Sequence, residues 1–110
     1  MPKAKVKTEP YREQLLKSLR DPEQAAAYLT ACLEDEDPRL FLLALRDVAD
    51  ARGGMGDLAR SARLNRESLY RMLSQSGNPS LDSLAAVLDA LGLRLSIQAV
   101  AARRRNRRSA

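Results

Sequence analysis

The sequence predicts an all-α fold on the strength of three observations. Apolar residues recur every three to four positions through most of the chain, which is the period of an amphipathic helix. Aromatic residues make up 4% of the 110 residues and hydrophobic residues 45%, so the core must consist mainly of leucine and alanine, both strong helix formers. Asp-Pro pairs and glycines separate the apolar stretches, where they are typical of helix starts and ends. A chain of this length is expected to form one domain.

Residues 1–20 are predicted to lie outside the main domain. Residues 1–10 have no apolar period and are expected to form an N-terminal arm. The stretch that follows spaces Leu15, Leu16 and Leu19 along one face of a helix. It is therefore either a short helix or a continuation of the arm.

Two helices are predicted between the arm and the middle of the chain. The Asp-Pro pairs at 21–22 and 37–38 each combine a capping carboxylate with a proline at the first helical position. The first helix should extend to about Glu34. The second is rich in leucine and should end at the glycines at 53–54. Because it is apolar on most sides, we expect it to be the central helix of the fold.

Residues 55–74 have the outline of a helix-turn-helix. Helices at 56–62 and 66–74 flank a three-residue turn at 63–65. Two helices that cross steeply need a small side chain where their backbones come closest, and Ala59 meets this requirement. Apolar residues at helical spacing are expected to hold the two helices together: Leu58, Ala59, Ala62, Leu64, Leu69 and Met72.

Two residues of the turn have a predicted conformation. Asn65 is expected to cap the second helix, because its short side chain can accept a hydrogen bond from the free amides of the first turn. Arg63 occupies the position at which a glycine often adopts a left-handed backbone conformation. If Arg63 keeps this conformation, the cost is about 1 kcal/mol.

The outward surface of the motif carries side chains that suit a DNA duplex. Arginine forms two hydrogen bonds with guanine, glutamate accepts from cytosine, and tyrosine contacts phosphate. We expect three residues to contact base edges: Arg66, Glu67 and Arg71. We expect three more to contact phosphates: Arg60, Arg63 and Tyr70. The capping residue, Asn65, completes the set of predicted DNA-binding residues. The alternative is an ordinary helical hairpin with a solvated charged face.

A last helix is predicted to complete the main domain, which spans residues 21–92. Residues 75–79 form a loop by composition. Ser80 then caps a helix whose leucines, alanines and valine keep the 3.6-residue period until Gly92 ends it.

Beyond this helix the apolar period changes to two. Leu93, Leu95 and Ile97 alternate with polar residues, which predicts a β-strand at 93–99. A lone strand must pair its backbone elsewhere, so it would pair with the same segment of a second subunit or with a strand of another protein. The alternative is an irregular extension that lies on the core. Residues 100–110 form an Arg-rich tail, which is either disordered or reaches phosphates or acidic surfaces.

Charge is distributed unevenly along the chain. The net charge of +5 combines two basic ends with a slightly acidic middle. Residues 52–74 hold five arginines against one aspartate and one glutamate, whereas residues 21–50 hold eight acidic residues against two arginines. Two surfaces of opposite sign indicate two different partners.

The composition does not favour several functional classes. The chain has no histidine, one cysteine and no glycine-rich phosphate loop, so we expect neither an enzyme nor a bound metal or other cofactor. One cysteine cannot form a disulfide within the chain, and no apolar run reaches the length of about 18 residues that a membrane span needs. We therefore expect a soluble cytoplasmic protein with no membrane partner.

Residues 20–98 resemble the HigA-type addiction-module antidote proteins, small antitoxins and repressors with a Cro/C1-type DNA-binding domain. The resemblance is carried in collinear order by DPEQAAAYLTACLEDEDPRLFLLALRDVADARG, LARSARLNRESLYRMLS and GNPSLDSLAAVLDALGLRLSI. It implies a five-helix lambda-repressor-like fold, a small RelE/HigB-like toxin as partner and repression of its own operon. The chain departs from the family in its turn, which usually reads Gly-Leu-Ser or similar, and in its Arg-rich tail.

We therefore expect a transcriptional repressor that binds a double-stranded DNA operator as a homodimer and serves as the antitoxin of a toxin-antitoxin module. The acidic residues of 21–50 would speed the capture of a small basic toxin. Two alternatives remain. One is a protein-binding module whose chief role is neutralisation, and the other is a phage-type Cro/C1 regulator with no toxin partner.

Overall fold

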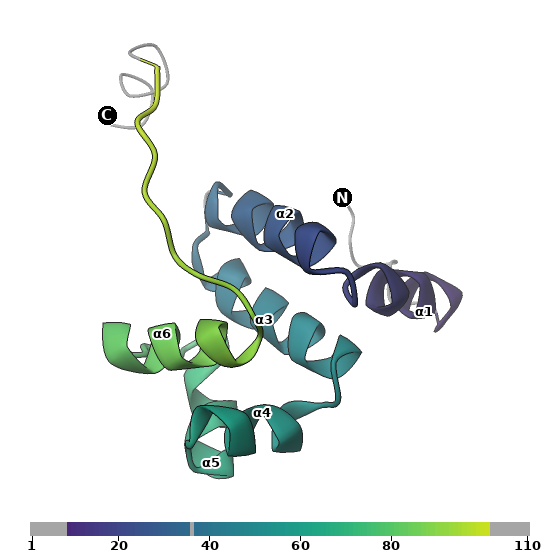
Figure 1. The fold of residues 1–110 in the computed structure, drawn as a ribbon, viewed down its shortest axis with the longest axis vertical. Helices are drawn as coiled ribbons and strands as arrows, with labels where there is room; N and C mark the ends of the chain where they lie inside the picture. The colour runs from purple at the N-terminus through teal and green to yellow at the C-terminus, as the bar shows by residue number, and fades with distance from the viewer. Residues whose placement is uncertain (1–8, 36, 102–110) are drawn as a thin grey trace.

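The computed structural model describes residues 9–35 and 37–101, and this part of the chain is all-helical (Figure 1). Its helices are α1 (Glu9–Ser18), α2 (Pro22–Leu33), α3 (Arg39–Ala51), α4 (Met55–Ala62), α5 (Arg66–Met72) and α6 (Leu81–Ala90). The predicted all-α class is confirmed. Most of the predicted N-terminal arm and of the Arg-rich tail lies outside the described residues.

The number of helices differs from the expected five, because α1 adds a sixth. The other five follow the predicted order, and α2, α5 and α6 begin at a side-chain cap, whereas α3 and α4 do not. The prediction of a proline at the first helical position is wrong for α3, which begins at Arg39, after Pro38. Asp21 accepts a hydrogen bond from the Glu23 amide at 3.2 Å. Ser80 accepts one from the Ser83 amide at 3.1 Å. These side chains satisfy amides that have no partner within the helix, so α2 and α6 begin where the sequence places a short polar residue.

Helix α3 lies at the centre of the fold, as predicted, with α1 and α2 on one side and α4 on another (Figure 1). Its buried residues form the middle of the core: Phe41, Leu42, Ala44, Leu45, Val48 and Ala49. The prediction that this helix is apolar on most sides is wrong for its remaining surface. That surface carries Arg46, Asp47 and Asp50, and each of these side chains has a contact with another helix.

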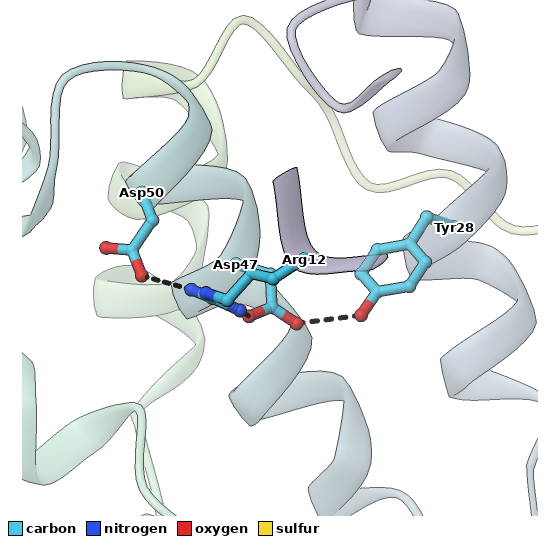
Figure 2. A network of polar contacts seen from close by, with 4 residues as sticks. All are labelled: Arg12, Tyr28, Asp47 and Asp50. Atoms are coloured by element: carbon cyan, nitrogen blue, oxygen red, sulfur yellow. Dashed lines mark hydrogen bonds and ion pairs between the residues drawn. The ribbon is translucent and has the colours of Figure 1, made fainter. Parts of the chain in front are cut away.

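A polar network joins α1, α2 and α3 (Figure 2). The guanidinium of Arg12 contacts the carboxylates of Asp47 at 3.1 Å and Asp50 at 2.8 Å. The hydroxyl of Tyr28 donates to the other oxygen of Asp47 at 2.7 Å. Burial, followed by this hydrogen bond, raises the pKa of Tyr28, and the hydrogen bond to Asp47 raises the pKa of Arg12. The network supplies a reason for α1 to form and to stay against α3.

Arg52 connects the ends of two other helices. It follows α3, and its Nη1 donates to the carbonyl of Leu91 at 2.7 Å while its Nε donates to the carbonyl of Leu19 at 3.4 Å. These carbonyls follow the last turns of α6 and α1, where helix ends carry unsatisfied acceptors and partial negative charge. One arginine therefore stabilises the C-terminal ends of α1 and α6.

The predicted strand at 93–99 is wrong, because the described residues contain no strand. The Leu93 amide donates to the carbonyl of Leu88 at 2.8 Å, and the chain then leaves the helices as an extended segment (Figure 1). Leu93 packs against the core, but Leu95 is exposed and Ile97 is 99% exposed. A ladder needs an edge, and the described part of this chain offers none.

Candidate nucleic-acid interface

The turn between α4 and α5 is closed by a left-handed arginine. Arg63 has φ 60° and ψ 44°, as predicted for this position. Its amide donates to the carbonyl of Arg60, and the amide of Leu64 donates to the carbonyl of Ala59 at 2.9 Å. This is the bonding pattern of a Schellman cap, which glycine adopts without steric cost. The chain turns sharply here, so three residues separate the end of α4 from the start of α5.

Asn65 holds the first turn of α5 in place. Its side chain accepts a hydrogen bond from the Ser68 amide at 3.1 Å, which confirms the predicted cap. The next two residues, Arg66 and Glu67, occupy the exposed first turn of this helix. The cap thus fixes the direction of α5 at the end where the predicted base-contacting residues begin.

The predicted contacts between α4 and α5 lie in the core. Leu58, Ala59 and Leu69 are buried, and Ala62, Leu64 and Met72 are half-buried against the same cluster. Sequence reasoning missed two further buried residues, Met55 and Leu73. Each is four residues from a predicted core position on its helix, so the helical period would have identified both.

All seven predicted DNA-binding residues are exposed. Arg60 forms an ion pair with Asp57 one turn earlier in α4, and Arg71 lies 3.4 Å from the Ser68 hydroxyl. The side chains of Arg63 and Arg66 form no hydrogen bond or ion pair with any described residue. These exposed residues lie at the end of α4, in the turn after it and on α5, and we call the set the α5 face and define it by Arg60, Arg63, Asn65, Arg66, Glu67, Tyr70 and Arg71.

One residue beside the α5 face was not predicted. The guanidinium carbon of Arg46, in α3, lies 5.1 Å from the centre of the Tyr70 ring, a cation-π distance. The Nε atom of Arg46 is buried and has no hydrogen-bond partner in the part of the chain that the structure describes. The sequence signal was an arginine in the middle of an otherwise leucine-rich helix.

Comparison with known proteins identifies the family. A model of the family described as probable addiction module antidote protein matches residues 11–99. The chain belongs to this family. An uncharacterized protein of Haemophilus influenzae is 39% identical over 80 residues, which is 73% of this chain and 81% of that protein. No solved structure matches the chain.

The acidic surface of this antidote-family chain is smaller than its sequence suggests. Asp47 and Asp50 are paired with Arg12, and Asp37 is paired with Arg39 at 3.2 Å. The backbone amide of Arg39, followed by its side chain, lowers the pKa of Asp37. Three of the carboxylates counted in residues 21–50 are therefore already neutralised within the fold.

A groove of about 420 Å³ lies between α2 and the extended segment after α6. Apolar side chains line much of it, among them Leu29, Leu33, Leu93 and Leu95, and Glu23 and Arg94 lie at the same groove. The α5 face contributes no residue to it. The antidote-family chain thus has two separate surfaces. None of the described helices combines the length and apolar character that a bilayer span requires.

Proposed function

We propose that this antitoxin-family chain binds operator DNA through the α5 face and represses its own operon, in the manner of the HigA-type proteins with a Cro/C1-type domain. The observation that carries the proposal is the pair of exposed arginines, Arg63 and Arg66, whose side chains have no partner within the described chain. Arginines without internal partners, next to a capped and anchored helix, suit the phosphates and base edges of a duplex. The proposed role is one of binding and involves no catalysis.

The residues of the α5 face divide by their position. Arg66, Glu67 and Arg71 project from α5 itself and are proposed to contact base edges in the major groove. A second group is proposed to contact phosphates: Arg60, Arg63 and Tyr70. This division follows the general arrangement in which the N-terminal part of the second helix enters the groove while the preceding helix and turn cross the backbone.

A homodimer would place two α5 helices on one operator. Successive major grooves on the same side of a duplex are about 34 Å apart, so a symmetric dimer fits a palindromic site. The extended segment at 93–99 is the proposed contact between subunits. Its backbone groups from residue 94 on form no hydrogen bonds within the described chain, and Ile97 is exposed. Contact with a second copy would remove this apolar side chain from water.

Neutralisation of a toxin is proposed for the opposite side of the molecule. Membership of the antidote family implies a toxin partner of some kind. A small basic RelE-like protein would suit the exposed carboxylates of α2 and the loop after it, such as Glu23 and Asp35, next to the groove beside Leu33. The proposed site of action of both activities is the cytoplasm.

Two arginine variants test operator binding. Arg66→Ala is expected to cost about 1–3 kcal/mol of binding free energy and to relax the preference at one base pair. Arg60→Ala is expected to weaken binding to all sequences alike, because a phosphate contact carries no sequence information. Arg20→Ala, an exposed arginine in the turn between α1 and α2, is the matched control and should bind like the parent. Parent-like binding by both test variants would show that the assignment is wrong.

A gel-shift assay on the upstream DNA, at two salt concentrations and with and without the neighbouring gene product, separates the alternatives. A repressor and antitoxin binds the DNA alone and forms a larger complex when the toxin is present. A phage-type regulator binds the DNA and ignores the neighbour. A protein-binding module binds the neighbour and leaves the DNA unshifted.

A further inference from the structure

We propose that Arg46 of α3 binds a DNA backbone phosphate together with Tyr70 of α5, so that the central helix contributes directly to the nucleic-acid interface. This inference rests on the proposed function and extends it to a residue outside the helix-turn-helix. The two residues are 24 positions apart in sequence, and the fold brings the Arg46 guanidinium to 5.1 Å from the centre of the Tyr70 ring.

The hydrogen-bonding state of Arg46 points to an absent anion. Arg12 contacts two carboxylates, and Arg52 contacts two carbonyls, although Nη2 of Arg52 is also buried and has no hydrogen-bond partner among the described residues. Among the described residues, Arg46 has the ring of Tyr70 as its one partner, although its Nε is buried. A buried donor without an acceptor destabilises a fold, and a bound ion is one of the explanations for a native structure that keeps such a donor.

The geometry of the pair suits a phosphate. A guanidinium presents planar donors that match two phosphate oxygens, and stacking on an aromatic ring holds that plane in one orientation. Tyr70 is 40% exposed and adds a hydroxyl donor on the α5 face. An arginine that is already held in place loses little side-chain entropy when it binds. The pair therefore forms a prepared phosphate site at the junction of α3 and α5.

A purely structural role predicts something different. If Arg46 only covers the Tyr70 ring, its loss should lower stability and affect DNA binding solely through the position of α5. If Arg46 binds a phosphate, the variant without it releases one counterion fewer from the DNA on binding. Its affinity should then depend less steeply on salt concentration. The slope of log affinity against log salt therefore distinguishes the two roles.

The test measures binding of the full chain to its operator and to an unrelated duplex, from about 50 to 200 mM salt. Arg46→Gln is expected to weaken both complexes about tenfold at low salt and to reduce the salt slope by about 1. Arg46→Lys should keep the slope while losing part of the affinity, because lysine retains the charge but not the planar donors. Arg20→Gln, the same change in the turn between α1 and α2 and away from α5 in Figure 1, should leave the slope unchanged.

An unchanged slope in a folded Arg46→Gln variant would overturn this inference and leave the proposed function intact. A parent chain that binds neither duplex would overturn both. If Arg46→Gln does not fold, nitrogen NMR of the parent decides, with the Arg46 Nε–H signal assigned by its loss in Arg46→Lys. A large shift of that signal on addition of the duplex supports the phosphate contact, and an unmoved signal rejects it.

Discussion

Two groups of arginines in this chain have opposite surroundings. Arg12 is held between Asp47 and Asp50 where α1 meets α3, whereas Arg63 and Arg66, after α4 and at the start of α5, have no hydrogen-bond or ion-pair partner among the described residues. The same charged group serves the fold in the first case and remains available to a ligand in the second. The network of Arg12, Asp47, Asp50 and Tyr28 should therefore govern stability, and the α5 face should govern binding.

The largest expected effect breaks this division, because it affects both properties. Leu69 is fully buried and fixes α5 to the core. Leu69→Ala should lower the free energy of unfolding by about 2–5 kcal/mol, since it leaves a cavity, and should also weaken operator binding by loosening α5. Urea unfolding and a DNA titration measure the two effects. Leu81→Ala, at a leucine that is 70% exposed, is the control and should change stability by less than about 0.5 kcal/mol.

The next variant tests the stability side alone. Asp47→Ala removes the acceptor of both Arg12 and Tyr28 and should lower the free energy of unfolding by about 1–2 kcal/mol. The expected loss is small for a residue with two hydrogen-bonded partners, because the Arg12 side chain is 40% exposed and solvent weakens its ion pair with Asp47. Asp50→Ala removes one exposed ion pair and should cost about 0–1 kcal/mol. Operator affinity should stay at the parent value, and a loss of affinity by the folded Asp47→Ala variant would contradict the division.

Tyr28 adds a dependence on pH to the same network. Burial, followed by the hydrogen bond to Asp47, raises the pKa of Tyr28 above its ordinary value of about 10. Above pH 10 the unfolded chain loses this proton and the folded chain keeps it, so the stabilisation present below pH 10 is lost as pH rises. Tyr28→Phe should lower the free energy of unfolding by about 1 kcal/mol at neutral pH. Above pH 10 the free energy of unfolding of the variant should fall less steeply with pH than that of the parent, and the two slopes should differ by at most about 1.4 kcal/mol per pH unit. If the free energy of unfolding changed equally with pH in parent and variant, Tyr28 would not contribute to the pH dependence of stability.

The smallest expected effect lies within the helix-turn-helix. Gly56 is in the first turn of α4, and a Cβ there would meet only the guanidinium carbon of Arg66, at 3.8 Å, which is ordinary contact. Gly56→Ala should therefore raise the free energy of unfolding by about 0.5–1 kcal/mol through helix propensity. Thermal unfolding measures the gain, and operator affinity should be unchanged. A lower melting temperature would show that the close approach of Arg66 is tighter than the geometry indicates.

Much of the helical framework was predictable from local chemistry. The caps at Asp21, Asn65 and Ser80 form as expected, because each satisfies amides within one turn of the residue itself. The sequence identified Arg63 as the turn position where glycine often adopts a left-handed conformation, and Arg63 keeps that conformation in the structure. The prediction of a strand at 93–99 was wrong, because a period of two shows only which side chains share a face. It does not supply the second strand with which the backbone must pair.

The candidate site also has features that the sequence predicted and features that it did not. The exposed residues of the α5 face were identified from the helical period, which separates inward from outward positions. Arg46 was missed because its contact with Tyr70 joins two helices that are separated by α4. The acidic surface was overestimated because charge counting does not detect the pairing of Asp47 with a distant Arg12.

From its residues alone this chain specifies where the helices begin, how the turn at 63–65 bends and which side of α5 faces outward, since these depend on interactions within a few residues. The packed molecule assigns the arginines to their roles: Arg12 to carboxylates, Arg52 to helix ends and Arg46 to an aromatic ring. Those pairings join residues far apart in sequence, so they follow from how the helices stack on α3 and not from any local pattern.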